Sequence, residues 1–142
     1  MTYDLFPQCI GTRHIAALTE KIAAYAPNVS SEHTPVSAFD KWVLASNLQK
    51  SIRRGLAHIA IGTATRLLAL DARYFWRRLL LIAYEDVGFA NIGLCYDLLK
   101  FFRREAAHAQ LGVERVATYF VNALSQSLSR TSRNQTRTTI GA

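Results

Sequence analysis

Two adjacent carboxylates, Glu85 and Asp86, are residues whose types suggest chemistry. Paired carboxylates catalyse hydrolysis when both converge on one reacting bond. Neighbouring residues of a helix point about 100° apart, because an α-helix has about 3.6 residues per turn. The two carboxylates therefore do not converge on one atom, and we expect them to carry no catalysis.

A second set of residues resembles a nucleophile and its base. Ser46 and Ser51 precede His58, and a histidine activates a hydroxyl when the two are hydrogen-bonded. The sequence contains no nucleophile elbow and no acid placed to orient the imidazole. The two cysteines, Cys9 and Cys95, show no metal-ligand spacing with the four histidines. We therefore expect no enzymatic activity, no cofactor and no metal.

The charge of the chain suggests a binding function. Its 17 Lys and Arg outnumber its 10 Asp and Glu, which gives a net charge of +7. Such a charge attracts anionic partners, either nucleic acid or an acidic protein surface. The residues predicted to bind nucleic acid or a protein partner are Lys50, Arg53, Arg54, Arg77, Arg103 and Arg104.

Composition and length predict one all-α domain. The chain has 142 residues and is half apolar, which suits a single core. Proline and glycine are sparse from 37 to 128, and Ala, Leu, Ile and Arg dominate. We expect a compact bundle of about five or six helices over residues 1–128. They are predicted at about 12–25, 37–55, 56–70, 72–88, 92–109 and 113–128.

Helix-end residues support these boundaries. Ser37 and Asp40 have the spacing of a capping box, Asp71 is a good N-cap, and Gly88 is a plausible C-cap. The helix expected at 72–88 is apolar on nearly every face in its second half. It is therefore predicted to lie at the centre of the bundle.

The same helix has two acidic residues in its last turn, Glu85 and Asp86. Acidic side chains are disfavoured there by the helix dipole, so cationic partners are expected. Arg78 lies seven residues before Glu85 on the same stripe, and the basic end of the 37–55 helix can approach in the bundle. We therefore predict ion pairs that involve Arg78, Glu85 and Asp86 and hold the helices together.

Residues 129–142 are basic and lack apolar periodicity. They are predicted to form a flexible tail, which either contacts nucleic acid without sequence preference or keeps the protein soluble. No apolar run of about 18 residues and no signal peptide are recognised. We expect a cytoplasmic protein without membrane contact.

Two motifs resemble the helical domain that follows the ATPase module in RarA/MgsA-type replication ATPases. The first is the run Asn47-Leu48-Gln49-Lys50-Ser51-Ile52-Arg53. The second extends from Asp71-Ala72-Arg73-Tyr74-Phe75-Trp76-Arg77-Arg78-Leu79 to Ala83-Tyr84-Glu85-Asp86-Val87-Gly88, with Arg66-Leu67-Leu68 before it. The similarity covers about residues 43–95.

The resemblance implies a fold like a clamp-loader collar, self-association, and a place beside single-stranded DNA or replication proteins. The family's phosphate-binding loop is missing from this sequence, so ATP binding of the family type is not expected. The segment Phe89-Ala90-Asn91 also departs from the acidic residue and proline that the family commonly has there.

Three functions remain open at this point. The first is a non-enzymatic adaptor, a motorless relative of the RarA/MgsA helical domain that engages a replication, repair or other nucleoprotein complex. The second is a mobile-element inhibitor of the anti-CRISPR type, which docks on a host nucleoprotein complex through protein contacts. The third is a homo-oligomeric scaffold. Tyr74, Trp76, Phe101 and Phe102 are candidate interface anchors, although core positions are favoured for most of them.

Overall fold

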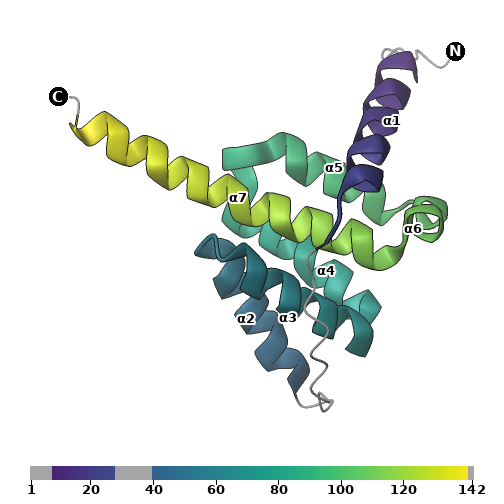
Figure 1. The fold of residues 1–142 in the computed structure, drawn as a ribbon, viewed down its shortest axis with the longest axis horizontal. Coiled ribbons are helices and arrows are strands. Elements are labelled where there is room, and N and C mark those ends of the chain that lie inside the picture. Colours follow the sequence, from purple (N-terminus) through teal and green to yellow (C-terminus); the bar gives the residue numbers. More distant parts are fainter. Residues whose placement is uncertain (1–7, 28–39, 141–142) are drawn as a thin grey trace, which may run out of the picture.

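The computed structural model describes the backbone of residues 8–27 and 40–140, and the side chains of residues 14–27 and 40–128. Every regular element in these ranges is helical, and none is a strand. The predicted all-α fold class is confirmed (Figure 1).

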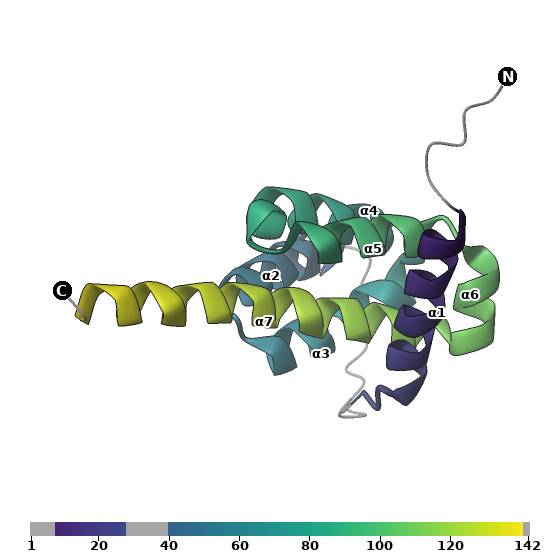
Figure 2. The same cartoon turned by 90° about the horizontal axis from the view of Figure 1, so that it is seen from above.

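The helices are joined by short connections. In chain order they are α1 (Gln8–Ala24), α2 (Lys41–Arg53), α3 (Ala57–Leu70), α4 (Ala72–Ile82), the π-helical turn η2 (Ala83–Val87), the 3₁₀ turn η3 (Gly88–Asn91), α5 (Ile92–Phe102), α6 (Glu105–Leu111) and α7 (Val113–Ile140). Helices α2 and α3 form a hairpin through Gly55, whose φ is 70°. Helix α7 runs along α3 and also contacts α1, α2 and α5 (Figures 1 and 2).

The start of α4 agrees with the sequence. Oδ1 of Asp71 accepts a hydrogen bond from the Tyr74 backbone N–H at 2.9 Å, so the predicted N-cap is confirmed. The start of α2 differs from the capping-box prediction, because Asp40 is the N-cap residue and its side chain makes no capping hydrogen bond. Ser37, the other half of that box, lies outside the described residues.

The helix predicted at 92–109 is two helices, so that prediction is wrong. The backbone leaves helical geometry at Arg104, whose φ is −107° and ψ is 79°, and α6 begins at Glu105. Nε2 of His108 lies 2.7 Å from the carbonyl oxygen of Phe101, near the end of α5. The His108 ring also packs on Trp76, 4.8 Å between centroids. These tertiary contacts accompany a break that no proline or glycine marks.

Helix α7 continues to Ile140, beyond the expected end at Leu128. Segment 129–140, predicted as a flexible tail, has a helical backbone. No glycine or proline lies between Val113 and Ile140, and each added helical residue gains one backbone hydrogen bond. The final portion of α7 extends past the other helices in both views (Figures 1 and 2).

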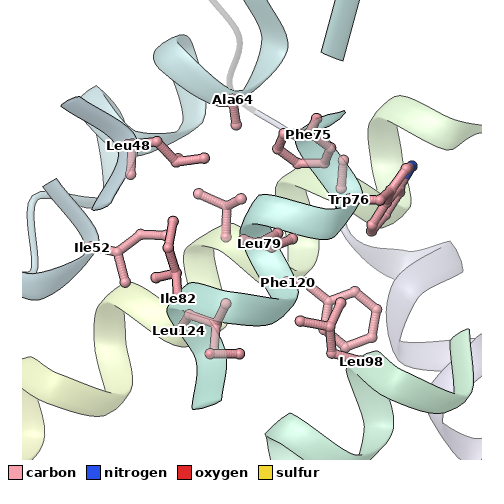
Figure 3. Close-up of a cluster of buried hydrophobic side chains, with 14 of the residues drawn as sticks. Leu48, Ile52, Ala64, Phe75, Trp76, Leu79, Ile82, Leu98, Phe120 and Leu124 are labelled. Atoms are coloured by element: carbon pink, nitrogen blue, oxygen red, sulfur yellow. The ribbon is translucent and has the colours of Figure 1, made fainter. Parts of the chain in front are cut away.

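One apolar core joins the helices. Figure 3 shows side chains of α4 between those of α2 and those of α5 and α7. The labelled residues are Leu48, Ile52, Ala64, Phe75, Trp76, Leu79, Ile82, Leu98, Phe120 and Leu124, and all are buried. Burying one such leucine or phenylalanine contributes about 1.5–3 kcal/mol, so these helices depend on one another for stability.

Helix α4 lies between α2 and the pair α5 and α7, as the predicted central position requires, but the apolar second half of the 72–88 segment is not buried on every face. Leu79 and Ile82 are fully buried, whereas Leu81 and Tyr84 are half exposed. Among the aromatic residues considered as interface anchors, Trp76 and Phe101 are buried, and Tyr74 and Phe102 are partly buried against the core. The core assignment favoured for them is confirmed.

In the described part of the chain, the stretch Ala72–Phe102 is long and apolar enough to cross a membrane, by length and composition alone. By this criterion the prediction that no segment has spanning length is wrong. Core helices of soluble proteins satisfy the same criterion. The backbone turns at Gly88, with φ of 39°, and α5 packs back against α4, so the stretch is not one straight helix.

Candidate binding surface

The turn after α4 is connected to the end of α2 by a charged hydrogen bond. The Arg53 guanidinium donates to Oδ1 of Asp86 from Nη2 at 2.8 Å and from Nε at 3.2 Å. The Asp86 side chain is 9% exposed and that of Arg53 is 60% exposed. The pair therefore lies at the edge of the core, with the carboxylate inside and the guanidinium reaching solvent.

A glutamine extends this contact into the bundle. Nε2 of Gln49 donates to Oδ2 of Asp86 at 3.0 Å, and Nη2 of Arg78 donates to Oε1 of Gln49 at 2.6 Å. We call Asp86, Gln49, Arg78 and Arg53 the Asp86 network. Nε of Arg78 is buried and has no hydrogen-bond partner. Gln49 carries no charge and gave no sequence signal of its own, so its bridging role was not predicted.

The predicted ion pairs are correct in part. Asp86 pairs with an arginine from the end of α2, as expected. Arg78 was expected to pair with an acid, but it donates to Gln49 instead. Glu85 is exposed and takes part in no ion pair among the described side chains. The reason is geometric, because adjacent residues of a helical turn face different directions and only Asp86 faces α2.

The same turn is fixed on its other side by α5. The thiol of Cys95 donates to the Ala83 carbonyl at 3.2 Å and lies 4.0 Å from the Gly88 carbonyl. Burial raises the pKa of the Cys95 thiol above its ordinary value. Gly88 then ends the turn with a positive φ of 39°, which only glycine adopts without strain. Its predicted role as a C-cap is confirmed for the π-helical turn rather than for α4.

A phenylalanine follows this fixed turn and lies almost entirely in solvent. Phe89 is 98% exposed, and two nearby residues of the chain, Tyr84 and Ile92, are also exposed. Large apolar side chains in solvent mark interaction sites when they occur together. Phe89 was noted in the sequence only as a departure from the resembled family. A phenylalanine directly after a helix-ending glycine was the signal that could have identified it.

The basic residues predicted to bind a partner fall into two groups. Lys50, Arg53 and Arg54 lie in or just after the last turn of α2 and are exposed. Arg53 bonds Asp86, so this group adjoins the turn that carries Phe89. We call Lys50, Arg53, Arg54 and Phe89 together the α2-end surface.

The second group, Arg77, Arg103 and Arg104, lies in α4 and after the end of α5. Arg77 follows Trp76 in the middle of α4, and Trp76 contacts His108. Arg103 and Arg104, which are exposed, connect α5 to the short helix that carries His108. The predicted set therefore does not form one site.

The described helices define a small all-α bundle with a charged, aromatic surface at one end. In the described part, His, Cys, Asp and Glu form no group of three that could hold a metal ion. No family model, no curated protein and no solved structure matches the chain. The two motifs that resemble the RarA/MgsA helical domain are in contact here, because Arg53 belongs to the first and Asp86 to the second. The resemblance itself stays a prediction.

Proposed function

We propose that this chain is a non-enzymatic adaptor that engages a nucleoprotein complex and contacts its nucleic acid through the α2-end surface. The observation that carries the proposal is the exposure of Phe89 three residues after Asp86, which binds Arg53 at the exposed basic end of α2. Single-stranded nucleic acid is bound by this combination, because bases stack on aromatic rings and phosphates pair with arginine or lysine.

The construction of the surface supports this proposal. Asp86 is held by Arg53 and Gln49, and Phe89 follows three residues later. A side chain on a fixed turn loses little conformational freedom on binding, which favours affinity. The resemblance to the RarA/MgsA helical domain agrees with this partner class, since it implies a place beside single-stranded DNA. In this proposal the chain is a motorless relative of that domain.

The proposal is tested by the binding of the full chain to a fluorescent single-stranded DNA oligonucleotide at several salt concentrations. Phe89→Ala is expected to weaken binding by roughly 5- to 150-fold, the range for loss of one base–aromatic stack. Arg54→Gln is expected to reduce the salt slope by about 0.7, the value for one phosphate contact on a single strand. Arg103→Gln, at the other end of the bundle, is the matched control and is expected to bind like the wild type.

Wild-type protein that shows no salt-dependent binding would overturn the proposal. Equal losses in Arg54→Gln and Arg103→Gln would also overturn the assigned surface, because they would indicate attraction by net charge alone. Both substitutions remove one exposed positive charge, so they change the net charge equally.

An inhibitor of the anti-CRISPR type is the second candidate, and the 98% exposure of Phe89 favours it as well. Buried aromatic anchors dominate protein–protein binding energy. In this case a pull-down from nuclease-treated host lysate is expected to recover the partner with the wild-type protein and with Arg54→Gln. The partner is expected to be absent from the pull-down with Phe89→Asp. Partners that disappear on nuclease treatment alone contradict this candidate and support the adaptor.

A further inference from the structure

The last part of α7 differs from the rest of the bundle in its position. Nδ2 of Asn91 donates to Oγ of Ser127 at 2.9 Å, which connects η3 to α7 beside the α2-end surface. Beyond that contact the helix backbone continues to Ile140 and projects past the other helices (Figures 1 and 2). We call residues 129–140 the α7 arm.

The composition of the arm is unusual for a helix that projects from a bundle. The sequence has no acidic residue after Glu114, and Ile140 is the one apolar residue of the arm. Its other residues are Arg, Ser, Thr, Asn and Gln, the types that donate hydrogen bonds to phosphate oxygens. Ser, Thr and Asn have modest helix propensity, and a short helical segment of such residues is marginal in water on its own. Binding of a ligand would therefore stabilise the helical form of the arm.

The arginines of the arm recur at helical spacing. Arg130, Arg133 and Arg137 stand at i, i+3 and i+7, which are neighbouring positions on one face of a helix. At about 1.5 Å rise per residue, the three positions span roughly 10 Å along the axis. No acidic residue of the arm competes for these charges.

We propose that the α7 arm binds duplex DNA, with Arg130, Arg133 and Arg137 pairing with backbone phosphates. An α-helix enters the major groove of B-DNA, which is about 12 Å wide. Charge complementarity selects this occupant, because a row of arginines without acids matches a phosphate backbone. A helix that lies on a membrane needs an apolar face, which this composition does not supply. This inference extends the proposed function. It rests on that function, because a nucleoprotein complex is where the arm would meet duplex DNA.

The first experiment compares the full-length protein with Arg130→Gln/Arg133→Gln/Arg137→Gln on a fluorescent duplex oligonucleotide of mixed sequence. The slope of log affinity against log salt is expected to become shallower by about 3, close to one unit for each phosphate contact. Arginine and glutamine have similar helix propensities, so the arm keeps its intrinsic helicity in the variant. Far-ultraviolet circular dichroism of the free proteins checks this.

The second experiment keeps composition and charge constant. Exchanging two residues, Arg133→Gln with Gln135→Arg, moves one arginine to a position about 140° from Arg130 and about 160° from Arg137 around the helix. If the arginine face binds phosphates, the exchange variant shows a shallower salt slope than the wild type, by about one unit. If the exchange variant binds like the wild type, the spacing has no role and the proposed mode is overturned.

The outcomes separate this inference from the proposed function. Duplex binding that the triple variant retains in full overturns the arm as the binding element. If Phe89→Ala still weakens single-strand binding in that case, the adaptor function stands without the arm. Loss of duplex binding in the triple variant, with single-strand binding unchanged, supports the arm whatever happens at Phe89. If the wild-type protein binds neither the single-stranded nor the duplex oligonucleotide, the proposed function and the proposal for the arm are both overturned.

Discussion

Arg53 and Asp86 lie 33 residues apart in the sequence, and two guanidinium nitrogens of Arg53 donate to one oxygen of the Asp86 carboxylate at 2.8 and 3.2 Å. This contact joins the end of α2 to the π-helical turn η2. Single π-helical turns are rare and are found at functional sites more often than elsewhere. Here the turn leads directly to the exposed Phe89. The contact therefore links the stability of the bundle to the proposed binding surface.

Removal of the Asp86 carboxylate is expected to destabilise the protein. Asp86→Ala leaves Gln49 without its acceptor and Arg53 without its ion pair. The loss of a nearly buried acceptor costs about 1–3 kcal/mol, to which the ion pair adds little because Arg53 is largely in solvent. Urea denaturation monitored by circular dichroism measures the change.

Glu85→Ala is the control for this prediction. Glu85 is exposed, so its removal is expected to change the free energy of unfolding by less than about 0.5 kcal/mol. Equal effects of Glu85→Ala and Asp86→Ala would mean that the Asp86 network adds no specific stability. The sequence alone had assigned both acids the same role.

Substitution by alanine is expected to change the stability of the fold in opposite directions at two glycines, Gly88 and Gly62. A Cβ at Gly88 or at Gly62 would meet no atom within 4 Å, so neither position is crowded. Gly88→Ala is expected to destabilise the fold by about 1–2 kcal/mol, because its φ of 39° is strained for residues with a side chain. Gly62→Ala, inside α3, is expected to stabilise it by roughly 0.5–1 kcal/mol.

Thermal unfolding of the two variants measures both effects in one experiment. The unfolding midpoint of Gly88→Ala is expected below that of the wild type, and that of Gly62→Ala above it. A shift of the same sign in both variants would contradict the assignment of the backbone conformation at Gly88.

Two leucines of α4 test its one-sided burial. Leu79 is fully buried and Leu81 is half exposed. Leu79→Ala is expected to cost about 2–5 kcal/mol, the range for a buried leucine that leaves a cavity. Leu81→Ala is expected to cost less than about 1 kcal/mol. Similar urea midpoints for the two variants would indicate a helix that is enclosed on both faces.

The N-cap of α4 predicts a dependence of stability on acid pH. The Tyr74 backbone N–H, followed by Lys41 and Arg73, lowers the pKa of Asp71 below its ordinary value of 3.8. The unfolded chain therefore binds a proton at a higher pH than the folded chain does. The stabilisation is present above the ordinary pKa and is lost as the pH falls through the lowered pKa.

Asp71→Asn isolates this contribution, because asparagine is an equally good N-cap that does not titrate. The free energy of unfolding of wild type minus that of Asp71→Asn is expected to be positive near pH 6 and to decrease below about pH 4. A difference that stays constant from pH 6 to pH 2 would contradict the lowered pKa.

Local features of the sequence were sufficient for several elements. The N-cap Asp71 and the boundary at Gly88 were predicted from single residues whose backbone preference does not depend on distant contacts. The split at Arg104 was not predictable in this way, because no residue there opposes a helix. His108 and Trp76 meet only in the folded bundle. The extension of α7 was missed because modest propensity was interpreted as disorder.

The sequence by itself determined that this chain is helical, basic and without a recognised catalytic motif, because composition, periodicity and charge are properties of residue types. It also indicated that an arginine would meet the acids at the end of α4. Only the tertiary structure decided that Asp86 rather than Glu85 is bound, that Gln49 joins Arg78 to it, and that Phe89 lies in solvent. These outcomes depend on which faces of distant helices meet, and packing of the shared core fixes those faces.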